Sequence, residues 1–176
     1  MANYVYIATS LDGFVATKDG GLDWLYDSPN PERSDYGYAE FMSRIDAIVM
    51  GRNTFEKILT FDEWPYEKPV FILSNSLSQL PEDMLDKANI VSGDIKKLIE
   101  QLHQQGYRNL YVDGGSVIQS FLQEDMIDEI IIARIPILLG EGFPLFGRTE
   151  KVLNFRHKRT EIYNNTQVKS HYIRER

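Results

Sequence analysis

A predicted junction between a strand and a helix is the most informative part of this sequence. It is the stretch Met50-Gly51-Arg52-Asn53-Thr54-Phe55-Glu56-Lys57-Ile58. Residues 47–50, directly before it, are a short apolar run that predicts a buried strand. Phe55 and Ile58 follow at helical spacing, so we expect a helix to begin close to Arg52. A glycine, an arginine and a hydroxyl at such a junction suit an anion such as a dinucleotide phosphate. An ordinary strand-to-helix turn with a surface arginine would explain this stretch alone equally well.

Two more apolar, β-leaning runs end in glycine or small polar residues, at 109–113 and at 70–73. Open sheets bind ligands beyond the carboxyl ends of their strands, so three such ends predict one ligand-binding edge. The candidate cofactor-binding residues at this edge are Gly51, Arg52, Asn53, Thr54, Ser74, Asn75, Gly114, Gly115, Ser116 and Val117.

The order of these segments resembles the dihydrofolate reductase-like fold, and most closely the branch with the reductase domain of bacterial riboflavin biosynthesis. The motifs that carry the resemblance span nearly the whole chain. They are Ala8-Thr9-Ser10-Leu11-Asp12-Gly13-Phe14-Val15-Ala16 with Gly21 and Trp24, Met50-Gly51-Arg52-Asn53-Thr54-Phe55, Leu73-Ser74-Asn75, Gly114-Gly115, Asp128-Glu129-Ile130 and Pro136-Ile137-Leu138-Leu139-Gly140-Glu141-Gly142. The resemblance implies an α/β fold with three α-β-α layers, a mostly parallel central sheet and a C-terminal antiparallel hairpin.

The resemblance also implies NADPH as the cofactor and hydride transfer to a small-molecule substrate. In such proteins the segment that contains Ala8 and Val15 lies over the nicotinamide, and the glycine pair approaches the pyrophosphate. Arg52 is then the candidate for recognising the 2′-phosphate. We also expect a β-carbon at Gly115 to obstruct the cofactor or the backbone geometry there.

Four further residues are candidates on the substrate side. Dihydrofolate reductases place a substrate-binding carboxylate near the start of the helix that precedes the Gly51 motif. A helix is predicted here from about Ser34, with Ser34 or Asp35 as its cap. Asp35 is therefore the catalytic candidate, although aspartate at a helix cap is also common for structural reasons alone. The substrate-binding candidates are Asp12, Trp24 and Asp27.

Several departures from the family pattern bear on the substrate. Ala133 stands where folate reductases use a threonine, and Asp23 precedes Trp24 where they use proline, so folate is disfavoured. A riboflavin-type substrate would need cations for its ribose phosphate, for which Arg134 or Arg148 are available. We therefore expect an NADPH-dependent reductase of a small heterocycle, either pteridine-like or ribosylaminopyrimidine-like. The alternative is a non-catalytic dinucleotide-binding protein that retains the fold, and a ligand-free scaffold is a third possibility.

Length and composition narrow the class further. The 176 residues predict a single domain over 1–176. The chain has no cysteine, so it has no disulfide and no zinc-deaminase signature, and we predict no metal site. No apolar run is long enough to span a bilayer and no signal peptide is evident, which favours a cytoplasmic location and no membrane partner. The net charge of −7 argues against nucleic acid as a partner.

The last third of the chain is predicted to form strands. A strand is expected over 127–135, and two more over 152–163 and 166–173 meet at Asn164-Asn165, a good pair for a hairpin turn. The run Ile130-Ile131-Ile132 is more apolar than one central strand needs. Together with the resemblance, this run predicts a homodimer, although helices of the same chain could also cover these residues.

Overall fold

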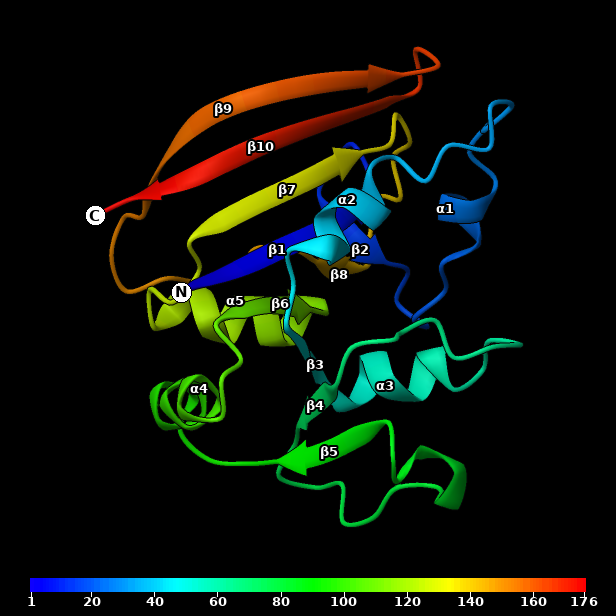
Figure 1. Ribbon diagram of the computed structural model, residues 1–176. Coiled ribbons are helices and arrows are strands. Elements are labelled where there is room, and N and C mark those ends of the chain that lie inside the picture. The colour runs from blue at the N-terminus through cyan, green and yellow to red at the C-terminus, as the bar shows by residue number, and fades with distance from the viewer.

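The computed structural model describes residues 1–176, and one eight-stranded sheet forms its centre (Figure 1). The strands of this sheet are β1 (Ala2–Thr9), β3 (Ala47–Gly51), β4 (Val70–Leu73), β5 (Ala88–Val91), β6 (Asn109–Asp113), β7 (Glu129–Arg134), β9 (Asn154–Tyr163) and β10 (Gln167–Glu175). Their order is β5-β4-β3-β6-β1-β7-β10-β9. All pairs from β5 to β7 are parallel, and β10 is antiparallel to both β7 and β9.

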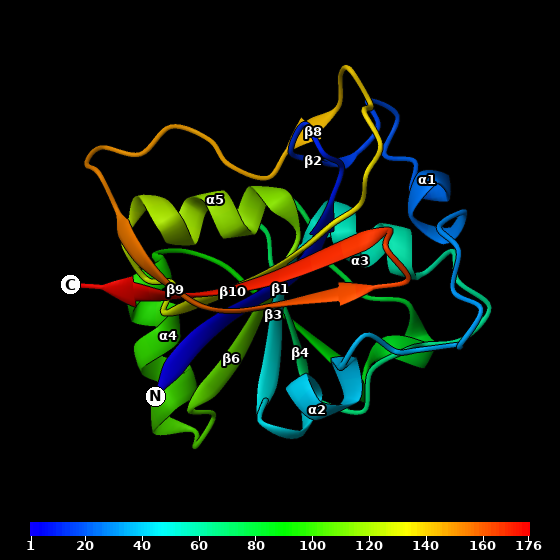
Figure 2. The same cartoon turned by 90° about the horizontal axis from the view of Figure 1, so that it is seen from above.

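Helices cover both faces of the sheet (Figure 2). The helical segments are α1 (Asp23–Tyr26), α2 (Tyr38–Ser43), α3 (Arg52–Ile58), the 3₁₀ turn η1 (Glu82–Met84), α4 (Ile95–Gln104) and α5 (Gly115–Gln123). Val49 and Val112 pack against α4 and α5, whereas Ile48 and Met50 pack against α2 and α3. This alternation confirms the predicted α-β-α layers, because successive strand residues point to opposite faces. None of the helices combines the length and the apolar character that crossing a membrane requires.

The two ends of the chain lie in the same half of the sheet. β1 lies between β6 and β7, as its apolar composition predicts, because parallel strands covered on both faces are apolar throughout. The C-terminal hairpin is confirmed as well. Residues 164–166 join β9 to β10, and Asn164 and Asn165 have φ of 51° and 52°, the left-handed conformation that a type I′ turn requires at both central residues. A separate two-stranded sheet, β2 (Phe14–Ala16) with β8 (Phe143–Pro144), lies beside β1.

One expectation about a particular segment is wrong. The helix expected from Ser34 begins only at Tyr38, and its N-cap is Gly37 with φ 84°. Tyr36 also has a left-handed φ of 57°, which breaks the helix before that point. Ile130, Ile131 and Ile132 are at most 7 % exposed, so the chain itself covers them, and the homodimer stays a prediction.

An ion pair fixes the end of β10 to the turn between α5 and β7. Both carboxylate oxygens of Asp125 accept hydrogen bonds from Arg174, at 2.7 Å from Nε and 3.0 Å from Nη2, and Lys151 lies 2.9 Å away. The hydrogen bonds from Arg174 hold the pKa of Asp125 far below its usual range. The Arg174 side chain is only 6 % exposed, so solvent screens this contact little.

We expect Asp125→Asn to lower the free energy of unfolding at pH 7 by about 1.5–3 kcal/mol, the range for a hydrogen bond to a charged group. Asparagine tolerates the φ of 56° at this position, so the turn itself is kept. Because the folded-state pKa is depressed, the stability contributed by Asp125 is present above the ordinary aspartate pKa and is lost as pH falls through the depressed one. Urea titrations at pH 7 and at successively lower pH should show the two proteins converging in acid. A constant difference would contradict this assignment.

Candidate functional site

One cavity of about 1400 Å³ opens where β1, β3, β4 and β6 reach their carboxyl ends. Ligand pockets commonly measure about 300–1,000 Å³, so this cavity has room for two ligands side by side. The position is the one at which open α/β sheets bind their ligands. The strand ends therefore bring together the segments that the sequence analysis selected.

The structure places every candidate cofactor residue on the wall of this cavity. Ala8 comes from β1 and Val15 from β2, and the others come from three strand-to-helix or strand-to-loop junctions. They are Ala8, Val15, Gly51, Arg52, Asn53, Thr54, Ser74, Asn75, Gly114, Gly115, Ser116 and Val117. No ligand contact tests their individual roles, so the cofactor assignment stays a prediction.

The steric demand at the glycine pair falls on Gly114. Its φ is +92°, and a β-carbon added there would overlap Oγ1 of Thr54. At Gly115 an added β-carbon would instead meet Cγ2 of Val15 at 3.2 Å, a contact that a small side-chain shift can relieve. The unusual backbone conformation that was expected at Gly115 is therefore found at Gly114. This residue is where the chain leaves β6 and turns into α5.

Two groups of donors face this end of the cavity. The first-turn N–H groups of α5, at Gly115, Ser116 and Val117, have no hydrogen-bond partner within the protein. On the far side, Arg52 donates from Nε to Glu56 at 2.6 Å and from Nη1 to Ser76 Oγ at 3.2 Å. Unpaired helix N–H groups and an arginine are the kinds of donor that bind phosphate.

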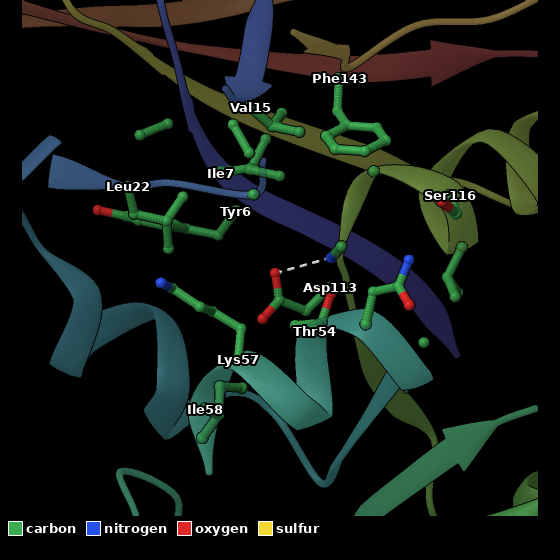
Figure 3. Close-up of a pocket in the computed structure, with 18 of the residues that line it drawn as sticks. Tyr6, Ile7, Val15, Leu22, Thr54, Lys57, Ile58, Asp113, Ser116 and Phe143 are labelled. Carbon is green, nitrogen blue, oxygen red and sulfur yellow. Dashed lines mark hydrogen bonds between the residues drawn. The ribbon is translucent and has the colours of Figure 1, made fainter. Parts of the chain in front are cut away.

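Asp113 is the acidic group deepest in the cavity wall (Figure 3). Its Oδ1 accepts from the backbone N–H of Gly114 at 2.9 Å, and its Oδ2 accepts from the hydroxyl of Tyr66 at 3.2 Å. Burial raises the pKa of Asp113 above the ordinary aspartate value, although these two hydrogen bonds oppose the shift. Burial, followed by the charge of Asp113, likewise raises the pKa of Tyr66. Asp113 is thus a carboxyl group that keeps its proton to higher pH than an exposed aspartate.

A model of the RibD C-terminal domain family matches residues 4–168. This chain belongs to the RibD C-terminal domain family. The match confirms the resemblance to the riboflavin branch, and it covers all of the strand ends that build the cavity.

The relatives of this RibD C-terminal domain protein include both uncharacterised proteins and named reductases. The chain is 34% identical to the uncharacterised protein YwjB of Bacillus subtilis over 175 residues, covering 97% of this chain and 96% of YwjB. It is 28% identical to the 2,5-diamino-6-ribosylamino-4(3H)-pyrimidinone 5′-phosphate reductase of Aquifex aeolicus, over 61% of this chain and 50% of that enzyme. The relationship therefore points toward reductases without fixing an activity for this chain.

Solved structures agree with the family and the fold. A crystal structure from Shewanella sp. PV-4, described provisionally as a riboflavin biosynthesis protein, superposes with a TM-score of 0.97 at 48% identity and covers 100% of both chains. Dihydrofolate reductase from Enterococcus faecalis, solved with NADP(H), has a TM-score of 0.67 at 15% identity and covers 99% of this chain and 97% of that one. The second comparison confirms the dihydrofolate reductase-like fold.

Asp35 lies on the cavity wall, but its surroundings do not suit a proton donor. Its two carboxylate oxygens accept from the backbone N–H groups of Gly37 and Ala39, each at 2.9 Å. These hydrogen bonds lower the pKa of Asp35, so the group is ionised across the neutral range. Asp35 therefore stabilises the start of α2 through these two contacts, and its catalytic assignment stays a prediction.

The structure does not bring the three substrate-binding candidates to the cavity wall. Asp12 points instead to the loop after β7, where it accepts from the N–H groups of Leu139 and Gly140 at 3.2 and 2.8 Å. Trp24 is a core residue with 7 % exposure, and Asp27 forms the C-cap of α1. In this structure Asp12 holds the loop after β7 in place through these two hydrogen bonds.

Asp113 and its hydrogen-bond partner Tyr66 are among the cavity residues that were not assigned a role from the sequence. A usable signal existed for Asp113, because it ends an apolar strand directly before the glycine pair of the predicted ligand edge. Tyr66 lies in an irregular segment, and its contact with Asp113 spans 47 residues of sequence. No local pattern could have paired them.

Proposed function

We propose that this protein is an NADPH-dependent reductase of a small heterocyclic compound, pteridine-like or ribosylaminopyrimidine-like. The observation that supports the proposal most is the shared position of Asp113 and the Gly114-Gly115 turn on one cavity wall. A proton donor and a candidate pyrophosphate site then lie within reach of the same ligand pair. Family membership adds support, since named relatives are reductases.

The residues present fit the cofactor. Unpaired N–H groups at the start of α5 suit the pyrophosphate, Gly51 and Gly115 allow close approach of the backbone, and Arg52 suits a 2′-phosphate. When bound, NADPH supplies the hydride for the reduction.

The chain itself contributes a proton and a dry pocket. When hydride adds to the carbon of a C=N or C=O bond, the electron pair of that bond moves to the nitrogen or oxygen. Asp113 in its protonated form donates a proton to this atom and becomes a carboxylate, which solvent reprotonates before the next cycle. Tyr66 donates a hydrogen bond to Oδ2 of that carboxylate and so stabilises it.

A thermal-shift series with NADPH and NADH, followed by absorbance at the reduced nicotinamide band with candidate heterocycles, tests this function. A cofactor at about one hundred times its Kd should raise the unfolding free energy by about 2.7 kcal/mol. The alternative of a non-catalytic dinucleotide-binding protein predicts stabilisation without turnover. Asp113 favours the reductase, because that alternative gives no role to an acid in the cavity.

Cofactor preference depends on Arg52 in this proposal. We expect tighter binding of NADPH than NADH, and Arg52→Ala should weaken NADPH binding by about ten- to a hundredfold, the effect of roughly 1.5–3 kcal/mol from a charge-assisted contact. NADH binding should change little. The side chain is 44% exposed, so the fold should tolerate the substitution. Calorimetric titration gives both constants, and the exposed Arg134, which lies off the cavity wall, provides the matched control Arg134→Ala. Equal affinity of the parent protein for the two cofactors would contradict the role of Arg52.

We also propose a homodimer of a cytoplasmic protein, with contact at the sheet edge formed by β9 and β10. Ile162 and Val168 pair across these strands and are 65% and 40% exposed, so an apolar patch remains on this face. Light scattering should report about twice the 20.4 kDa mass of one chain. Ile162→Glu should shift that mass toward a single chain without unfolding it. A single-chain mass for the parent protein across a dilution series would contradict the proposal.

A further inference from the structure

The cavity has a substrate half that differs from its cofactor half. We define the substrate half as the wall formed by residues 20–38, by residues 56–66, and by the side chains around Asp113. Aromatic rings dominate it, and they are Tyr6, Tyr26, Tyr36, Tyr38, Phe61 and Tyr66. Such a wall suits a flat ring system, because aromatic faces and edges pack on one another favourably.

Four charged side chains complete this substrate half, namely Asp35, Glu56, Lys57 and Asp113. Glu56 is paired with Arg52 at 2.6 Å. Asp35 is already engaged by two backbone N–H groups, as described above. Lys57 forms no ion pair and no side-chain hydrogen bond with the rest of the chain. Figure 3 shows its amino group extending from α3 into the cavity toward Leu22. Lys57 is therefore the single cation here that a substrate can engage.

The other cations that could have served a ribose phosphate lie elsewhere. Arg134 and Arg148 are exposed and do not line the cavity, so neither can hold the phosphate for which the sequence analysis considered them. Lys169 is buried behind the wall, where its amino group donates to the Tyr36 carbonyl at 2.6 Å and lies 2.9 Å from Glu161. These contacts leave Lys169 no free charge for a ligand.

A phosphate monoester carries about −1.5 to −2 charges at pH 7 and three strong acceptor oxygens. Proteins meet this demand with arginine forks, several cations or unpaired helix N–H groups. In the substrate half, Lys57 supplies one positive charge, while Asp35 and Asp113 place acidic groups on the same wall. A dianion would be poorly neutralised, but a single acceptor such as a ring carbonyl oxygen would be well matched.

We propose that the substrate of this cavity is an unphosphorylated aromatic heterocycle, neutral or singly charged, with one acceptor oxygen bound by Lys57. This inference rests on the proposed reductase function and narrows its substrate. It sets the chain apart from its relative named for a ribosylamino-pyrimidinone 5′-phosphate. The ring packs among the tyrosines, and the bond to be reduced faces Asp113.

Calorimetry with the full chain saturated in NADP⁺ tests the inference without turnover. The probes are matched pairs that differ only by phosphate: riboflavin and its 5′-phosphate, neopterin and its monophosphate, and the ribosylamino-pyrimidinone and its 5′-phosphate. We expect the unphosphorylated compound of at least one pair to bind. The phosphorylated compound of that pair should bind at least about tenfold more weakly. Equal or tighter binding of the phosphorylated member, or no binding in any pair, would overturn the inference. A separate titration with NADPH alone tests the proposed function, so the two failures are distinguishable.

Substitution of Lys57 gives a second readout. Lys57→Met should weaken binding of the heterocycle by about ten- to a hundredfold and leave the Kd for NADPH unchanged. Lys57→Arg should restore part of the affinity for the heterocycle. Lys97→Met is the matched control, since Lys97 is an exposed lysine on α4 that lies off the cavity wall. Unchanged heterocycle binding in Lys57→Met would overturn the role of this lysine.

Discussion

Asp113→Asn should lower kcat by about a hundred- to ten-thousandfold, the contribution typical of a positioned general acid, while the Kd for NADPH stays unchanged. The variant keeps the local structure. The amide oxygen can accept from the N–H of Gly114, and the amide nitrogen can donate to the hydroxyl oxygen of Tyr66. What the variant loses is the transferable proton.

The pH dependence of the rate separates this role from a structural one. The parent protein should be fastest below the raised pKa of Asp113 and should slow as pH rises through that value, because the acid must be protonated to act. Asp113→Asn should lack this limb of the profile. Asp27→Asn, at a residue off the cavity wall, is the control. A larger loss of kcat in Asp35→Asn than in Asp113→Asn would return the catalytic role to Asp35.

Stability provides a readout that needs no substrate. Between the ordinary aspartate pKa and the raised folded-state pKa, the folded protein binds more protons than the unfolded chain, so stability falls as pH rises through this window. Above this pH window, the loss of unfolding free energy caused by Asp113 no longer changes with pH. Asp113→Asn removes the ionisable group, so the variant should be more stable than the parent at pH 7, as thermal unfolding can show. Lower stability of the variant at pH 7 would mean that the carboxylate is favoured by its surroundings.

The strands and helices around the cavity were predictable because local signals mark them. Apolar β-leaning runs end in glycine or serine at Gly51, Ser74 and Gly114, and Asp94 caps α4 by accepting from the N–H of Lys97. Each signal lies within a few residues of the element that it starts or ends. The shared ligand edge then followed from parallel strands ending together.

The substrate half was not predictable in the same way, because its contacts join distant parts of the chain. Asp12 was expected to bind substrate, but its carboxylate holds N–H groups 127 and 128 residues further along. Tyr66 and Asp113 meet across 47 residues. The resemblance transferred a carboxylate to Asp35 by its sequence position, whereas the fold supplies the buried acid from the end of β6.

Gly114→Ala should be the most damaging single substitution at the cofactor end of the cavity. The backbone there has φ +92°, which alanine adopts only with strain, and a residue held in such a region costs about 1–3 kcal/mol. The added methyl would also overlap Oγ1 of Thr54, and overpacking typically costs about 1–3 kcal/mol more. We therefore expect a loss of about 2–6 kcal/mol in unfolding free energy and at least a tenfold weaker Kd for NADPH, because the α5 N–H groups move with the turn.

A double-mutant cycle with Thr54→Ala separates the two causes of this loss. Without Oγ1 the nearest remaining atom is Cβ of residue 54 at 3.3 Å, so Gly114→Ala in the Thr54→Ala background should recover the overpacking part and keep the φ strain. Gly115→Ala is the matched control, since its new methyl meets only Cγ2 of Val15 at 3.2 Å and no left-handed φ is required. Urea unfolding and calorimetric NADPH titration of the four proteins of the cycle and of Gly115→Ala measure both effects. If Gly115→Ala is more damaging than Gly114→Ala, the close approach of the two strand-to-helix junctions is not what shapes this end of the cavity.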